Sequence, residues 1–228
     1  METKRSPKSV KQLVEEQCLR WKETQKEKPK AERVPIIAVS RQEGTLAGPV
    51  AKILAGKLKL DIYESRLIKE VADNTRLSEE VVKTLDEKSR TSVDDLFADL
   101  EDKLGMTSDG FFAHLVKVIG AIERHGAGII IGRGASIILD RKKNLKVRFI
   151  APLEMRIGNV AETLNLPIEE AEKHIRKVDA NRRAFLRKYF NVSFEDVSYF
   201  DLVINNEFID AETSAGIIEA AFEKKRRL

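Results

Sequence analysis

Cationic side chains are concentrated in one stretch of this sequence, residues 173–188, where seven Lys or Arg stand against a single acid, Asp179. The arginines of this stretch are Arg176, Arg182, Arg183 and Arg187. A solvated helical face usually mixes charges of both signs, so this surplus indicates a phosphate ligand, which guanidinium groups hold well. Arg176, Arg183 and Arg187 would share one face of a continuous helix. The alternative is a surface helix in which Asp179 pairs with Arg183.

A further arginine stands between two glycines. The apolar run Gly128–Ile131 ends in Gly132-Arg133-Gly134. The glycines permit a tight bend, and the guanidinium group could then reach a phosphate. The alternative is an arginine that bridges two loop carbonyls. Arg41, which follows the first apolar run, could act in the same way as Arg133.

The segment from Ser40 to Pro49 connects that first apolar run to a helical pattern. It contains Gly44 and Gly48, and a strand, a glycine-containing loop and a helix are the layout in which backbone N–H groups hold phosphate. The segment has no lysine, however, and Pro49 offers neither a hydroxyl nor an amide hydrogen, whereas phosphate loops usually end in Lys followed by Ser or Thr. An ordinary connection between a strand and a helix is the alternative.

Short apolar runs alternate with helical patterns along the chain from Val34 onward. Strands are expected at residues 36–40, 61–63, 128–131, 146–150 and 201–204. Helices are expected at about 49–58 and 65–74, from 78, at 93–104 and 111–124, and after the last strand to about 225, with a loop at 104–110. Strands separated by helices predict an α/β fold with a five-stranded parallel sheet and helices on both faces.

Residues 1–33 form a separate, basic leader. They carry ten Lys or Arg and six Asp or Glu, so that residues 34–228 hold 31 of each and are neutral. A neutral body does not indicate a nucleic-acid partner. Helical spacing is expected from Ser9 to Glu27, followed by a linker between Pro29 and Pro35. The apolar stripe of this helix packs on the body, on a second copy, or on a protein partner.

Composition limits the class of protein further. The single cysteine, Cys18, excludes an internal disulfide, and no apolar run approaches the roughly 18 residues that cross a bilayer. The N-terminal residues lack the apolar stretch of a secretory signal. We therefore expect a cytoplasmic protein without a membrane partner.

Several ordered motifs of residues 34–222 resemble the cytidylate kinase-like family of P-loop nucleotide kinases. The matching segments are Ile37–Gly44, Leu60–Ile68, Gly128–Ala135, Asp179–Arg182 and Tyr199–Asn205. The resemblance implies the three-layer fold of P-loop nucleotide kinases for residues 34–228, with residues 1–33 as an N-terminal helical extension. It also implies that residues 167–190 form a lid.

The resemblance implies transfer of a phosphoryl group from ATP with Mg²⁺ to a nucleoside monophosphate, CMP or dCMP. The implied catalytic residues are Arg133, Asp179, Arg182 and Arg183, of which Arg133, Asp179 and Arg182 would also bind the monophosphate. The implied ATP and phosphate contacts are Arg41, Gly44, Thr45, Leu46, Ala47, Gly48, Arg176 and Arg187. No protein metal site is implied beyond the nucleotide-bound Mg²⁺, which Thr45 could contact.

The sequence departs from the family in the phosphate loop. Leu46 and Ala47 replace glycines, Ala47 takes the place of the usual lysine, and Pro49 takes that of the hydroxyl that binds Mg²⁺. Two hypotheses follow: a kinase whose cations come from elsewhere in the chain, and a non-catalytic module for nucleotide sensing or protein interaction. A third is a homodimer formed through the leader helix, with vestigial nucleotide binding.

Overall fold

The computed structural model describes residues 8–27, 34–104 and 109–227. Most of the predicted linker between Pro29 and Pro35, and most of the predicted loop at 104–110, lie outside these residues. The chain divides into two compact units. The larger unit comprises residues 34–65 and those from 126 onward, and the smaller comprises the leader helix with residues 66–125.

The larger unit is built on one parallel sheet. Its strands are β1 (Ile37–Arg41), β2 (Asp61–Tyr63), β3 (Gly128–Ile131), β4 (Leu145–Ile150) and β5 (Leu202–Asn205). The strands lie in the order β2-β3-β1-β4-β5, and every neighbouring pair is parallel. All five predicted strands are confirmed, within one residue at either end. Because β1 is central, its carboxyl end lies beside those of β3 and β4.

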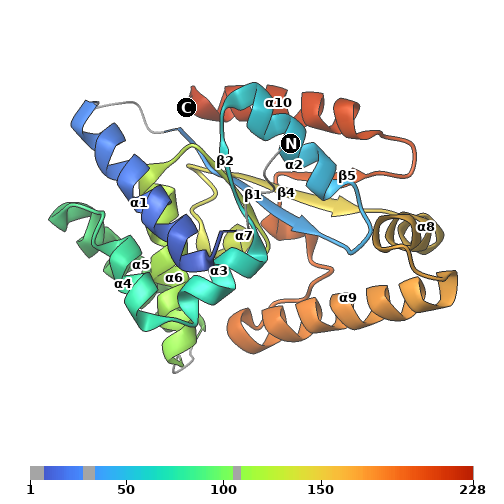
Figure 1. Cartoon of the computed structure of the whole chain (residues 1–228), viewed down its shortest axis with the longest axis horizontal. Helices are drawn as coiled ribbons and strands as arrows, with labels where there is room; N and C mark the ends of the chain where they lie inside the picture. The colour runs from blue at the N-terminus through green and yellow to red at the C-terminus, as the bar shows by residue number, and fades with distance from the viewer. Residues whose placement is uncertain (1–7, 28–33, 105–108, 228) are drawn as a thin grey trace, which may run out of the picture. The chain divides into compact units, whose positions relative to one another are not determined.

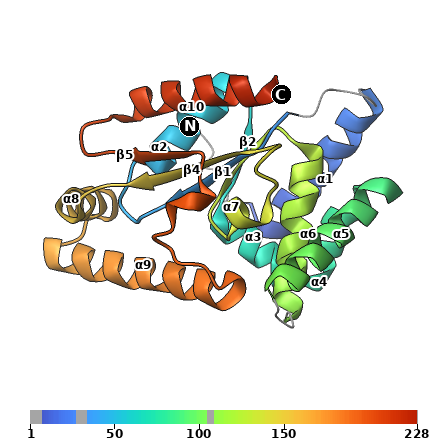
Figure 2. The same ribbon diagram turned by 180° about the vertical axis from the view of Figure 1, so that it is seen from behind.

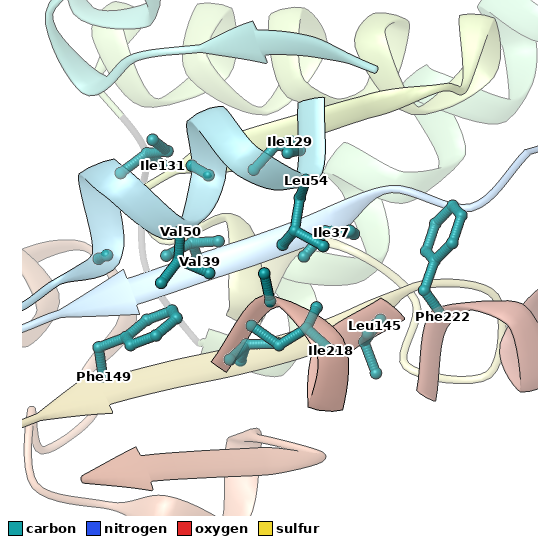
Figure 3. Close-up of a cluster of buried hydrophobic side chains, with 14 of the residues drawn as sticks. Ile37, Val39, Val50, Leu54, Ile129, Ile131, Leu145, Phe149, Ile218 and Phe222 are labelled. Carbon is teal, nitrogen blue, oxygen red and sulfur yellow. The ribbon is translucent and has the colours of Figure 1, made fainter. Parts of the chain in front are cut away.

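Helices cover both faces of this sheet, as predicted. They are α2 (Ala47–Leu58), α7 (Ala135–Ile138), α8 (Leu153–Leu164), α9 (Ile168–Phe190) and α10 (Ala211–Arg226), with a short 3₁₀ helix at Val197–Tyr199. Figures 1 and 2 show α2 and α10 along one face and α9 along the other. On the first face, side chains from α2 and α10 close over the apolar residues of the strands, as in Figure 3. This core fixes the strands whose carboxyl ends carry the candidate residues.

The basic segment forms one continuous helix, α9, whose charges suit its dipole. Glu169 and Glu170 lie in the first turn, and Arg187 and Lys188 lie in the last. Acidic side chains are stabilised at a helix N-terminus and basic ones at its C-terminus. Asn191 ends the helix in the left-handed conformation, with φ of 51°. The helix has 23 residues, so side chains at its two ends lie far apart and can belong to different sites.

The smaller unit is helical. It contains α1 (Val10–Glu27), α4 (Thr75–Val82), α5 (Glu87–Leu104), α6 (Gly110–His125) and α3 (Ser65–Ala72), except that the first residue of α3 belongs to the larger unit. Helix α5 begins six residues earlier than the periodicity indicates. The apolar stripe of α1 is covered within this unit: Cys18 lies 4.0 Å from the carbonyl oxygen of Glu80, and Trp21 stacks on His125 with ring centroids 4.0 Å apart. None of the helices in the described ranges is both long and apolar enough to span a bilayer.

This stack makes stability of the smaller unit dependent on pH. Burial lowers the pKa of His125 to about 4, whereas in the unfolded chain it is near 6.5. Between these two pH values the ring is neutral in the folded unit and protonated in the unfolded chain. Stability should therefore be full above about pH 6.5 and should fall by up to roughly 1.4 kcal/mol per pH unit towards pH 4. Urea unfolding followed by fluorescence of Trp21, the only tryptophan, measures this slope. His125→Phe should remove the histidine contribution, and an unchanged slope would contradict it.

Candidate active site

Three of the predicted arginines line one cavity at the carboxyl ends of β1 and β3. Arg41 follows β1, Arg133 follows β3, and Arg182 comes from α9. The cavity has a volume of about 250 Å³. Its other lining residues are Val39, Ser40, Ser65, Gly132, Gly134, Ser136, Val178, Asn181, Phe185, Leu186 and Phe194. Ligands of parallel sheets collect at this edge, so the topology brings together cations that are far apart in the sequence.

Arg41 is held as a cation among other cations. Burial, followed by the nearby guanidinium groups of Arg182 and Arg133, lowers the pKa of Arg41 to about 10, against the opposing effect of Glu43 and Glu64. Arg41 therefore stays charged at neutral pH. A positive charge that its neighbours disfavour in this way is stabilised by an incoming anion.

Arg133 occupies a strained backbone position. Its φ is 54°, in the left-handed region that side chains other than glycine rarely adopt. Its Nε donates to the carbonyl oxygen of Ser65 at 2.9 Å, and its guanidinium group lies 5.4 Å from the ring centroid of Phe185. Gly132 beside it has φ of 83°, a backbone conformation in which any other residue would be strained, and a Cβ there would also displace the end of the Arg41 side chain. Strain of this kind persists where the surroundings enforce it, which favours a functional role.

Asp179 is buried and turned toward the loop that follows β1, so it does not line the cavity. Its Oδ1 accepts from the backbone N–H of Glu43 at 2.9 Å, and its Oδ2 accepts from Arg156 at 2.8 Å. Arg182 lies 3.4 Å from the same carboxylate, forms an ion pair with Glu43, and donates to the carbonyl oxygen of Arg41 at 3.1 Å. Arg182 thus lines the cavity and at the same time contacts the loop that follows β1.

The loop at residues 42–46 is also held by side chains from α8 and from the segment that follows β5. Arg156 of α8 donates to the carbonyl oxygen of Glu43 at 3.2 Å, and Asn159 donates to that of Gly44 at 2.8 Å. The side chain of Asn206 accepts from the N–H of Leu46 at 3.2 Å. Gly44 has φ of 82°, and a Cβ there would lie 2.4 Å from the carbonyl oxygen of Arg156. The first turn of α8 is therefore in direct contact with the loop.

The remaining predicted loop residues have structural surroundings. The hydroxyl of Thr45 donates to the carbonyl oxygen of Gln42 at 2.9 Å. Ala47, the first residue of α2, is buried in the core, Leu46 packs against that core, and Gly48 is exposed. These side chains do not fill the arginine cavity.

Three arginines of α9 lie apart from the cavity. Arg176 is exposed and pairs with Glu172. Arg183 and Arg187 line a second cavity, of about 310 Å³, where Arg183 donates to Glu195 at 3.1 Å. The alternative pairing of Asp179 with Arg183 is therefore wrong. Arg176, Arg183 and Arg187 therefore do not form one site, because Arg176 lines neither of these two cavities.

In this structure, the loop groups that could bind a polyphosphate with Mg²⁺ are engaged by other parts of the protein. The N–H of Glu43 already binds a carboxylate, α8 covers Gly44, and the hydroxyl of Thr45 is turned to its own loop. Within the described ranges, no group of three or more His, Cys, Asp or Glu could hold a metal ion. In contrast, the arginine cavity fits a small anion such as a phosphate monoester.

Sequence reasoning missed several residues of this site. Arg156 orders both Asp179 and the loop, and Ser40 and Ser65 line the cavity. Arg148 is a charged residue inside a strand predicted to be buried, a contradiction that marks a position with a special role. Ser40 and Ser65 lie within segments that resemble the family, but nothing in those segments distinguishes them as cavity residues. Arg156 carries no pattern in the sequence, because contacts between distant segments give it its role.

The sheet order, the loop between β1 and α2, and the cations at the strand ends define the fold of a P-loop kinase. The sequence model of the cytidylate kinase-like family matches residues 36–207, and the chain belongs to that family. Membership indicates a nucleotide kinase-like protein. A crystal structure of an uncharacterized protein from Eubacterium ventriosum has the same fold, with a TM-score of 0.67 at 19% identity over 84% of this chain and 99% of that one.

Curated relatives are cytidylate kinases of distant sequence. The protein from Sulfolobus acidocaldarius is 26% identical over 83% of this chain and 94% of its own length, and that from Sulfurisphaera tokodaii is 28% identical over 81% and 93%. The protein from Staphylothermus marinus is 32% identical over 43% of this chain. The chain spans about half the length of this last relative, 56%. It spans 52% of the similar relative from Desulfurococcus amylolyticus.

Proposed function

We propose that this protein is a cytoplasmic phosphotransferase that forms a nucleoside diphosphate from a nucleoside monophosphate, CMP or dCMP, with ATP and Mg²⁺ as the donor. The observation that supports the proposal is the convergence of Arg41, Arg133 and Arg182, from three separate segments, on one cavity. The acceptor class comes from the relatives, which are cytidylate kinases.

The arginines would bind and orient the acceptor phosphate. Phosphoryl transfer needs little covalent chemistry from the protein, because positioning and stabilisation of oxygen charge account for most of the rate. Arg133 is held by Ser65 and Phe185, and Arg182 by Glu43 and Asp179, so their guanidinium groups are positioned before the ligand arrives. Preorganised cations cost no rearrangement during the reaction. ATP with Mg²⁺ supplies the phosphoryl group when bound.

A second candidate function is a nucleotide-binding module without turnover. The contact of Asp179 with the N–H of Glu43 favours it, since a carboxylate takes the place where a phosphate oxygen would bind. In this function the arginine cavity would still bind a nucleoside monophosphate. The two functions therefore share a ligand and differ in catalysis.

One pair of measurements separates these functions. Purified protein is assayed for ADP release with ATP, Mg²⁺ and each nucleoside monophosphate, and its melting temperature is measured with the same compounds. We expect ADP release with CMP or dCMP, together with an increase in melting temperature. An increase without ADP release would support the module. If no monophosphate causes ADP release or raises the melting temperature, both functions are contradicted.

A further inference from the structure

Arg148 is a buried charge without an ion-pair partner in the part of the chain that the structure describes. It lies in β4, where it is 3% exposed, among residues that are otherwise mostly buried and apolar. No carboxylate of the described residues lies within ion-pair distance of it. A buried cation of this kind is costly unless another group compensates its charge. The contacts of the guanidinium group therefore have to explain why Arg148 is buried.

The guanidinium group of Arg148 is fixed by two rings and one hydroxyl. It lies 4.1 Å from the ring centroid of Phe194 and 5.6 Å from that of Phe200. Its Nη1 donates to Oγ of Ser40 at 3.3 Å. Aromatic faces attract the cation but leave its charge in place, because each ring is neutral. Burial lowers the pKa of Arg148, with Glu195 and Asp179 opposing this effect from a distance.

Two of these contacts also line the arginine cavity. Ser40 and Phe194 both face it, so Arg148 lies directly behind its wall. A serine hydroxyl has one hydrogen to donate and lone pairs to accept. Since Oγ of Ser40 accepts from Arg148, and no described residue accepts its hydrogen, that hydrogen is available to a ligand oxygen in the cavity.

The charges around the cavity do not balance. Arg41, Arg133 and Arg182 line it, and Arg148 stands behind it. The acids near these arginines are fewer than the cations: Asp179 pairs with Arg156 and Arg182, Glu43 pairs with Arg182, and Glu64 acts on Arg41 without forming an ion pair with it. Positive charge therefore remains in excess at the cavity, and a dianion would compensate it better than a monoanion.

We propose that Arg148 and Ser40 act together as positioning residues that make the cavity select the dianionic form of a phosphate monoester. Arg148 orients the hydroxyl of Ser40 and adds a buried positive charge, and Ser40 donates to a phosphate oxygen. This inference rests on the proposed function, because it takes the arginine cavity as the monophosphate site. It assigns a determinant of substrate charge that includes Arg148, a residue outside the segments that resemble the family.

The test compares two ligands that differ in charge. CMP carries a dianionic phosphate, and its methyl ester, cytidine 5′-O-methyl phosphate, keeps the base and sugar with one negative charge fewer. Calorimetry at pH 8 gives the dissociation constant of each for the wild-type protein, Ser40→Ala, Ser40→Thr and Arg148→Met. Arg226→Met is the matched control, because it removes one exposed arginine at the end of α10. Circular dichroism checks that each variant is folded.

The wild-type protein should bind CMP more tightly than the ester. Ser40→Ala and Arg148→Met should each lower the affinity for CMP about tenfold and should lower the affinity for the ester less. The reason is that hydrogen bonds to charged groups contribute more than those between neutral groups. Ser40→Thr, which keeps the hydroxyl, should retain the preference, and so should Arg226→Met. If the role of Arg148 is purely structural, Arg148→Met should lower the affinities for CMP and for the ester by the same factor.

Several outcomes would overturn the inference. Equal losses for CMP and its ester, or no loss in either variant, would remove the role in charge selection. If Arg148→Met does not fold, the comparison of Ser40→Ala with Ser40→Thr decides. A wild-type protein that prefers CMP over the ester but releases no ADP would refute the proposed catalysis and leave this inference standing. A wild-type protein that binds no CMP would overturn both.

Discussion

Replacing Arg133 with methionine is expected to reduce the rate of CDP formation from CMP at least 100-fold. The left-handed backbone, the hydrogen bond to Ser65 and the contact with Phe185 fix this guanidinium group at the cavity. Methionine keeps much of the side-chain volume and removes the charge. The loss of one preorganised donor to developing charge typically costs about 10² to 10³ in rate. Steady-state kinetics with varied CMP measures the effect.

The division between kcat and KM gives the reason for this loss. If Arg133 binds the phosphate equally in the ground state and the transition state, KM rises and kcat is unchanged; if it acts mainly in the transition state, kcat falls. Arg226→Met serves as the control, because it removes an arginine remote from the cavity in the fold. Full activity in Arg133→Met would contradict the assignment of the cavity as the acceptor site.

Replacing Asp179 with alanine is expected to destabilise the larger unit by about 3–5 kcal/mol, because it leaves Arg156 buried without its ion-pair partner. The side chains of this ion pair are 9% and 5% exposed, and the carboxylate also holds the loop through the N–H of Glu43. The free energy of unfolding in urea, compared with that of the wild-type protein, measures the loss.

The double variant Asp179→Ala with Arg156→Met provides the control. If the loss comes from an unpaired buried charge, removing the arginine as well should restore part of the stability, and the two effects should not add. Additive losses would show that Asp179 and Arg156 act separately. A loss below about 1 kcal/mol in Asp179→Ala would contradict a buried pair and would match an exposed one.

The main elements of the fold could be predicted because their signals are local. A short apolar run flanked by glycine or proline and followed by a helical pattern indicates a buried parallel strand, and β1 and β3 follow this rule. The other three strands depart from it, because β4 contains two charged residues and neither β2 nor β5 is flanked by glycine or proline. The late start predicted for α5 has a physical reason. Glu87 to Ser92 are polar, and the periodicity of buried residues begins only at Val93, although the helix itself starts with Glu87.

The candidate site was only partly predictable. Arg41 and Arg133 follow strands of a parallel sheet, and the carboxyl ends of such strands meet at one edge, so the sequence placed both near a ligand. Arg182 and Arg183 are neighbours with the same side chain, yet one lines the cavity and the other pairs with Glu195. Their difference depends on the rotation of α9 against the sheet, and helical periodicity within α9 does not contain that rotation.

By itself the sequence determined the order of strands and helices, the family, and the two arginines that follow strands. These properties depend on residues close together in the chain or on ordered motifs. Only the tertiary structure decided that Asp179 binds the N–H of Glu43, that α8 covers Gly44, and that Arg148 is buried behind Ser40. Such contacts join residues more than a hundred positions apart. They depend on how helices pack against the sheet, because packing selects among rotations that the same pattern of apolar residues allows.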